Sequence, residues 1–169
     1  MSPSPDDGSE SDTLSARVAR LEARGALKEL KAAYCYSIDA RDWDRLRSLF
    51  TSDAVLDFGG LGTYEGDDGL DRFVREFVEA NLDGSAHMVH NPVLDVDGDT
   101  ATGRWYVESP VTYADGSGGW RQGVYDDEYR RVDGEWRFAS VQMRFLYTAD
   151  FGPDGWPDVS LVRGGQDTL

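Results

Sequence analysis

The sequence predicts an α+β domain in which one curved antiparallel sheet wraps against N-terminal helices. Apolar residues recur at three- and four-residue steps in the first half of the chain, which is typical of amphipathic helices. From His87 onward the period changes to two, and Asp-Gly dipeptides of the kind found in hairpin turns separate the alternating segments. Helices followed by long hairpin strands favour a sheet with its helices on one face, and a sheet curled over a helix forms a cone with a pocket inside.

A long first helix is expected over residues 14–40, after cap residues at Asp12 and Thr13. Gly25 predicts a kink or a break between two helical pieces. Asp42 begins a short second helix, and the acidic pair Asp67-Asp68 suits the start of a third. The apolar stripe of the first helix consists of Leu14, Val18, Leu21, Leu27, Leu30, Tyr34 and Ile38.

Strands are expected over residues 93–96, 100–113, 121–132 and 135–147. The folded domain is therefore placed at residues 13–149. Residues 1–12 are rich in Ser, Pro, Asp and Gly and are predicted to be a disordered acidic tail. Residues 150–169 form a Gly- and Pro-rich tail, which is expected to fold over an opening of the domain or to pack on a neighbouring subunit.

The charge balance narrows the range of partners. The 169 residues include 32 acidic and 17 basic ones, and the net charge of −15 disfavours nucleic acids and anionic membranes. The excess of Asp and Arg over Glu and Lys predicts the surface of a halophilic protein. No secretory signal or long apolar run is present, so a cytoplasmic protein is expected. The single cysteine, Cys35, is expected to be buried and inert, and no metal site is predicted.

Two histidines, His87 and His90, are the only side chains with an ordinary pKa near neutrality. In an alternating strand they point to opposite faces, so only one of them is expected to face a cavity. Asn91 shares the face of His87 if the strand is regular, although Pro92 favours a bulge. His87 is the candidate general acid/base, and the alternative is a histidine held by a local hydrogen bond.

Four segments together resemble the SnoaL-like family of the nuclear transport factor 2-like superfamily, whose members are α+β cones. The resemblance covers about residues 14–148. Within the family, the sequence is most similar to the branch containing scytalone dehydratase and bile-acid 7α-dehydratase. The segments are Tyr34-Cys35-Tyr36-Ser37-Ile38-Asp39, the stretch from Asp42 to Ala54 with its Leu49-Phe50-Thr51-Ser52-Asp53-Ala54, His87 with Asn91, and Asp97-Gly98-Asp99-Thr100-Ala101.

The resemblance implies catalytic roles for His87, Asp39 and Tyr34. His87 would move protons, Asp39 would orient it, and Tyr34 would polarise a carbonyl group. Tyr34 as a core aromatic and Asp39 as a solvated helix-end residue beside Arg41 are the alternatives. The substrate-binding candidates are Asn91, Glu108 on the middle strand, Arg144 on the last strand, and Tyr106, for which a subunit contact is the alternative.

The expected function is that of a cofactor-independent lyase (dehydratase) or related isomerase. Its substrate would be a hydroxylated carbonyl compound of polyketide, steroid or terpenoid type, acted on by His/Asp acid-base chemistry. The alternatives are a non-catalytic ligand-binding or assembly module and the small subunit of a ring-hydroxylating dioxygenase. The resemblance also implies a homo-oligomer, a trimer or a dimer, whose contacts would be the first helix and the outer sheet face.

Overall fold

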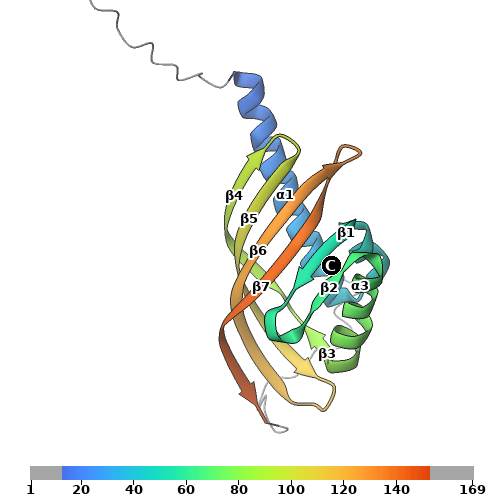
Figure 1. The fold of residues 1–169 in the computed structure, drawn as a ribbon. Helices are drawn as coiled ribbons and strands as arrows, with labels where there is room; N and C mark the ends of the chain where they lie inside the picture. Colours follow the sequence, from blue (N-terminus) through green and yellow to red (C-terminus); the bar gives the residue numbers. More distant parts are fainter. Residues whose placement is uncertain (1–12, 153–169) are drawn as a thin grey trace, which may run out of the picture.

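A long helix lies against a curved sheet, as the computed structural model of residues 13–152 shows (Figure 1), and the expected α+β cone is confirmed. The predicted tail at 1–12 and most of the one predicted at 150–169 lie outside the described residues. Asp150 and Phe151, which were expected in the second tail, instead belong to the last strand because they pair with Gly119 and Gly118. The helical elements are α1 (Leu14–Ala40), α2 (Trp43–Ser48), the 3-10 turn η1 (Gly59–Leu61), α3 (Gly66–Arg72) and the π-helix η2 (Phe73–Glu79). The strands are β1 (Phe50–Asp57), β2 (Thr63–Glu65), β3 (Leu82–Ser85), β4 (Met88–Asp97), β5 (Thr100–Tyr113), β6 (Gly118–Val132) and β7 (Glu135–Phe151).

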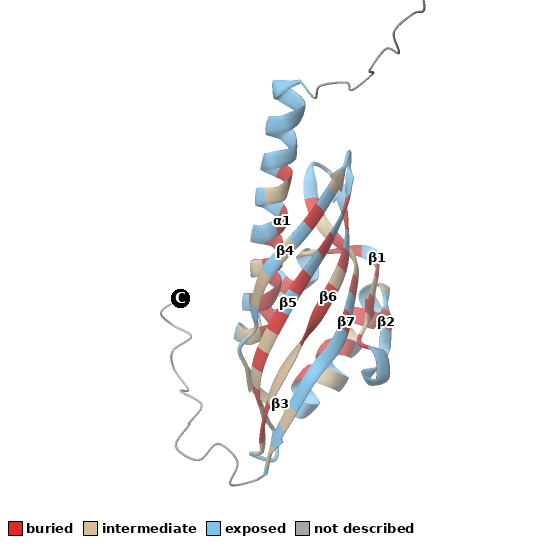
Figure 2. Ribbon diagram, turned by 90° about the vertical axis from the view of Figure 1, so that its left-hand side faces the viewer, coloured by how far each residue is buried: buried red, intermediate tan, exposed pale blue. Residues whose placement is uncertain are grey.

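Helix α1 runs unbroken through Gly25, contrary to the expected kink. Gly25 lies on the exposed side of the helix with open space around it, while Ala23 and Leu27 on either side of it are buried. Packing of that buried side therefore outweighs the low helix propensity of one glycine. The first turns of α1 extend past the sheet and are exposed (Figure 2).

The end of α1 fixes the position of Asp39. Arg41 adopts the left-handed conformation (φ 58°), and its backbone N–H donates to the carbonyl oxygen of Ile38 at 3.1 Å, which closes the last turn. A carboxylate in the last turn lies against the negative end of the helix dipole. Hydrogen-bond donors outside the helix therefore stabilise the Asp39 carboxylate in this position.

The sheet order is β2-β1-β7-β6-β5-β3, and β4 also pairs with β5. All pairs are antiparallel except β1 with β7, which makes the sheet mixed. Strands β3 and β4 follow each other along the same edge of β5 and are joined by Ala86 and His87. His87 therefore lies in the link between the β3–β5 pairing and the β4–β5 pairing.

Irregularities in β7 and β4 decide which of their side chains face inward. Trp136 and Phe138 on β7 are buried, but the register shifts after Phe138, and the next buried side chains are Val141 and Met143. In β4 the register shifts between His90 and Val93, where Asn91 adopts φ 53°. Each extra residue reverses the alternation of inward and outward side chains beyond it.

Candidate active site

A cavity of about 930 Å³ lies between the C-terminal half of α1, the segment from Phe58 to Leu82, and the inner face of the sheet. The rings of Phe58 and Phe73 stack with centroids 4.8 Å apart and form part of its wall. Most of the lining is apolar, as is usual for small-molecule sites. Its polar and ionisable side chains are Tyr34, Asn81, His87, Ser109, Tyr113, Asp115, Ser117, Arg121, Tyr125, Thr148 and Asp150.

His87 and Asp39 meet at the wall of this cavity. The distance from Nδ1 of His87 to Oδ1 of Asp39 is 2.6 Å, and the two side chains are 14% and 21% exposed. The backbone N–H of His87 donates to Oδ2 of Asp39 at 2.7 Å, and the Ser85 hydroxyl donates to Oδ1 at 2.9 Å. Three donors thus hold one carboxylate, so the carboxylate and the imidazole are fixed relative to each other.

This contact determines which tautomer of His87 is present. An ionised carboxylate only accepts hydrogen bonds, so Nδ1 of His87 carries the proton that it shares with Asp39. In the neutral ring Nε2 then carries the lone pair. His87 lines the cavity, so the His87–Asp39 pair, here called the dyad, presents a proton acceptor to it. Asp39 stabilises the imidazolium that forms when His87 accepts a proton.

Tyr34 provides a hydroxyl group in the same cavity. It is buried and hydrogen-bonded to Tyr125, and both rings line the cavity. One hydrogen bond between two hydroxyl groups uses one proton, so the pair retains a second proton that it can donate to a ligand. Burial raises the pKa of Tyr34 far above its usual value of 10.0, so its hydroxyl stays protonated at all ordinary pH values.

A buried ion pair beneath these tyrosines was not predicted. Lys31 Nζ lies 2.9 Å from Oδ2 of Asp127, and both side chains are completely buried. Tyr129 donates to Asp127 at 2.7 Å, and the Lys31 ammonium lies 3.5 Å from the centroid of the Tyr125 ring. Burial raises the pKa of Asp127, and the Lys31 ammonium acts in the opposite direction. The pair supports the floor of the cavity without lining it.

Cys35 is buried, as expected, and burial raises the pKa of its thiol to about 12. A thiol of that kind is a poor nucleophile at neutral pH. Within residues 13–152 no group of three or more His, Cys, Asp or Glu side chains is placed to hold a metal ion. The helices of the same segment include none long and apolar enough to cross a membrane.

The four expected substrate-binding residues do not line the cavity. Tyr106 and Glu108 alternate with the inward-facing Trp105 and Val107 and lie on the outer face, where Glu108 lies 3.8 Å from His90. Arg144 also lies on the outer face, with a side chain 62% exposed, because the shift after Phe138 reverses the parity of β7. Asn91 is exposed at the bulge of β4.

Residues 19–142 match the SnoaL-like domain family. An uncharacterised protein of Mycobacterium tuberculosis is 34% identical over 129 residues, which cover 71% of this chain and 83% of that protein. A gamma-hexachlorocyclohexane dehydrochlorinase of Sphingobium indicum is 29% identical over 122 residues, which cover 71% of this chain and 78% of the enzyme.

Solved structures have the same architecture. A hexachlorocyclohexane dehydrochlorinase from Novosphingobium barchaimii superposes with a TM-score of 0.76 at 26% identity, over 86% of this chain and 98% of that one. A Novosphingobium aromaticivorans protein, provisionally assigned as a scytalone dehydratase, gives a TM-score of 0.74 at 24% identity, over 80% of this chain and 91% of that one. The second likeness concerns the fold alone.

Proposed function

Because this chain belongs to the SnoaL-like domain family, as its sequence predicted, we propose that it is a cofactor-independent lyase of the dehydratase type or a related isomerase. Its substrate would be a hydroxylated carbonyl compound of polyketide, steroid or terpenoid size. The observation that carries the proposal is the 2.6 Å contact between His87 and Asp39 at the wall of a largely apolar cavity. An oriented imidazole facing such a cavity suits proton abstraction next to a carbonyl group.

The proposed reaction begins when Nε2 of His87 removes the proton from the carbon next to the substrate carbonyl. The electron pair of that C–H bond forms a double bond to the carbonyl carbon, and the π pair of the carbonyl group moves to its oxygen. A hydroxyl group of the Tyr34–Tyr125 pair donates a hydrogen bond to the resulting enolate oxygen. The bond from the β-carbon to its hydroxyl then breaks as the carbon–carbon double bond forms. The His87 imidazolium returns its proton to the departing oxygen, and water leaves. Asp39 remains ionised and stabilises the imidazolium in between.

Loss of a halide is a second candidate reaction, favoured by the dehydrochlorinase relative. Chloride leaves without accepting a proton, so the same base would suffice. In an isomerase, His87 would return the proton to another carbon of the substrate.

A screen for product formation tests the proposal. Cyclic β-hydroxyketones and chlorinated cyclohexanes are incubated with the wild-type protein and with the His87→Ala variant. We expect loss of water or chloride with at least one class, and none with the variant. Elimination that persists in His87→Ala would refute the assignment, whereas binding without turnover would favour a ligand-binding module. An iron-containing partner that co-purifies with the chain would favour the dioxygenase subunit.

Replacing Tyr34 by phenylalanine is expected to lower kcat by about 10²-fold, because the enolate loses a preorganised donor. KM should change less, since the ground-state carbonyl carries little charge. The raised pKa of Tyr34 further predicts that ionisation of its hydroxyl causes no fall in rate near pH 10. Tyr36→Phe is the matched control because Tyr36 lies on the same helix and is 59% exposed. An equal loss in both variants would remove Tyr34 from the mechanism.

We also propose that the chain forms a homo-oligomer, a trimer or a dimer. Large apolar side chains are exposed on the first turns of α1 and on the sheet, for example Leu21 at 68% and Tyr147 at 67%. Neighbouring exposed apolar side chains, such as Leu14, Val18 and Leu21 on one helix, mark association surfaces. Light scattering should therefore give two or three times the chain mass of 18.8 kDa. A mass of 18.8 kDa at micromolar concentration would contradict this expectation.

A further inference from the structure

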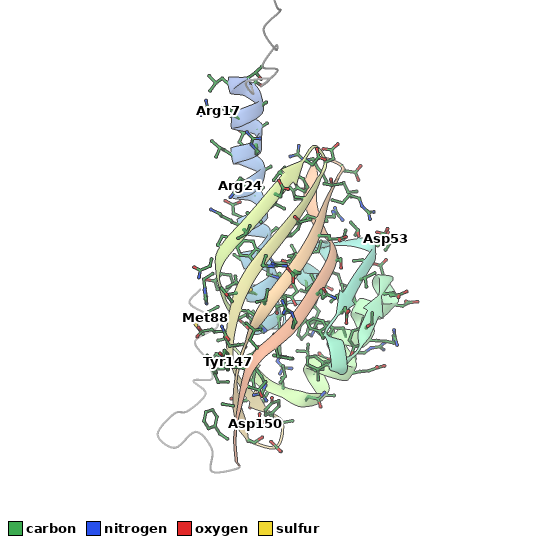
Figure 3. All side chains as sticks on the ribbon, turned by 60° about the vertical axis from the view of Figure 1, so that its left-hand side comes forward. Arg17, Arg24, Asp53, Met88, Tyr147 and Asp150 are labelled. Carbon is green, nitrogen blue, oxygen red and sulfur yellow. The ribbon has the colours of Figure 1, made fainter. Side chains whose placement is uncertain are left out.

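A second polar cluster lines the same cavity and was not predicted. Arg121 on β6 is only 16% exposed, and its Nη2 donates to the Tyr113 hydroxyl and to the Asp150 carboxylate. Its Nη1 donates to the carbonyl oxygens of Trp120 at 3.1 Å and Ala149 at 2.9 Å. The guanidinium is therefore held in one place by four acceptors. Figure 3 shows Asp150 near the end of β7, at the opposite end of the molecule from Arg17.

The guanidinium of Arg121 and the Tyr113 ring lie beyond the dyad, toward the end of β5. The pairs Met88–Glu108 and Ser85–Val111 place His87 opposite Ser109 on β5. Arg121 pairs with Ser109 across β5, so its backbone lies about 10 Å from that of His87, two strand spacings away. Its side chain extends over Gly119 toward Tyr113, whose backbone is about 14 Å from that of Ser109 at about 3.4 Å per residue. The apolar side chains of Val111, Phe77 and Phe145 are among those that line the same cavity. A ligand that contacts both polar groups therefore extends along this apolar wall.

The charges of the cluster favour a neutral group over an anion. Asp150 already compensates the guanidinium of Arg121. Asp115 lines the same cavity, and its hydrogen bonds from Ser117 lower its pKa, so it is ionised at neutral pH. A carboxylate would therefore meet one cation and two anions. A carbonyl or hydroxyl oxygen meets no such repulsion.

Tyr113 is the donor that such an oxygen would meet. Its oxygen accepts a proton of Arg121, which polarises the hydroxyl, and it keeps its own proton to donate. The ring also lines the cavity. A hydroxyl backed by a guanidinium is a stronger donor than a free phenol.

We propose that the cavity binds its ligand at two ends: His87 and Tyr34 at one end, and the Tyr113 hydroxyl, positioned by Arg121, at the other. The ligand is then a neutral fused-ring compound with an oxygen function at each end of an apolar skeleton. This inference deepens the proposed function and rests on it for the identity of the reacting end. Tyr113 determines specificity, and Arg121 is a positioning residue.

Calorimetric titration of two matched probes tests the inference. We expect 5α-androstane-3,17-dione to bind about 10-fold more tightly than 5α-androstan-3-one, which lacks the second oxygen. In Tyr113→Phe this preference should fall to within about twofold. Tyr106→Phe, on the outer face of the same strand, should keep it. Equal affinities in the wild-type protein, binding of neither probe, or an unchanged preference in Tyr113→Phe would overturn the inference.

Two further comparisons sharpen the test. Arg121→Met should reduce the preference in the wild-type background but not in the Tyr113→Phe background, because Arg121 acts through Tyr113. The 17β-carboxylate analogue of the monoketone should bind more weakly than the dione, and tighter binding would show an anion site instead. Binding requires no turnover, so the titrations are repeated with His87→Gln. A retained preference with no effect of that variant on catalysis would refute the proposed reaction and leave the two-ended site in place.

Discussion

Replacing Asp39 by asparagine should lower kcat by about 10²- to 10⁴-fold while the protein remains folded. The carboxylate accepts from Nδ1 of His87, from the His87 backbone N–H and from Ser85. An amide has only one acceptor oxygen, and its NH₂ group facing Nδ1 would shift the imidazole proton to Nε2. The ring would then present a donor to the substrate where the reaction needs a base. Steady-state kinetics on the substrate identified by the screen measure the effect.

The matched control is Asp44→Asn, which removes one negative charge from a fully exposed side chain. It should leave kcat within about twofold of the wild-type value, since exposed surface charges contribute little. An Asp39→Asn variant with wild-type kcat would show that Asp39 serves only to end the helix. Circular dichroism of both variants establishes that the fold is retained.

Replacing Lys31 by methionine should destabilise the protein by about 3–5 kcal/mol. The change leaves the Asp127 carboxylate completely buried without its cation. It also removes the ammonium that packs on the ring of Tyr125 at the floor of the cavity. Urea unfolding followed by fluorescence gives the difference in the free energy of unfolding.

Two further variants separate the effect of the unpaired charge from the effect of losing a lysine. Lys28→Met changes an exposed lysine on the same helix and should cost less than about 1 kcal/mol. The double variant Lys31→Met/Asp127→Leu removes both charges and should recover most of the lost stability. If Lys31→Met costs no more than Lys28→Met, the pair makes no net contribution to stability.

The position of the dyad could be predicted from the sequence because it depends on few features. Asp39 lies in the last turn of a helix whose apolar stripe is plain, and His87 immediately precedes the long strand β4. Both lie near the ends of regular elements, where small errors in boundaries change little. The 2.6 Å contact between them depends on the left-handed residue Arg41 and the β3–β4 link, which local patterns do not specify.

The faces of the sheet could not be predicted because alternation holds only while a strand is regular. Strict alternation along β7 would place Arg144 on the face of Trp136 and Phe138, but one register shift after Phe138 places it on the opposite face. Bulges are set by how a curved sheet closes over its core, which is a property of the whole fold. The same reasoning applies to Asn91 at the shift in β4.

Other residues carried a signal that was not used. Lys31 lies within the apolar stripe of α1, one residue after Leu30. Asp127 lies between Tyr125 and Tyr129 on the same inward face of β6. A charged residue in each of two apolar patterns predicts a buried pair. Tyr113 and Arg121 showed no such pattern, since their contact spans the turn between β5 and β6 and depends on the length of the arginine side chain.

Hydrogen exchange at the carbon next to a ketone tests the proposed role of His87 most directly. In D₂O, 2-decalone is followed by NMR with the wild-type protein, His87→Gln and His90→Gln. His90 lies beside Glu108 on the outer face, so its variant is the matched control. We expect the wild-type protein and His90→Gln to accelerate exchange equally, and His87→Gln to fall to the buffer rate. Exchange by His87→Gln at the wild-type rate would contradict the claim that His87 is the base.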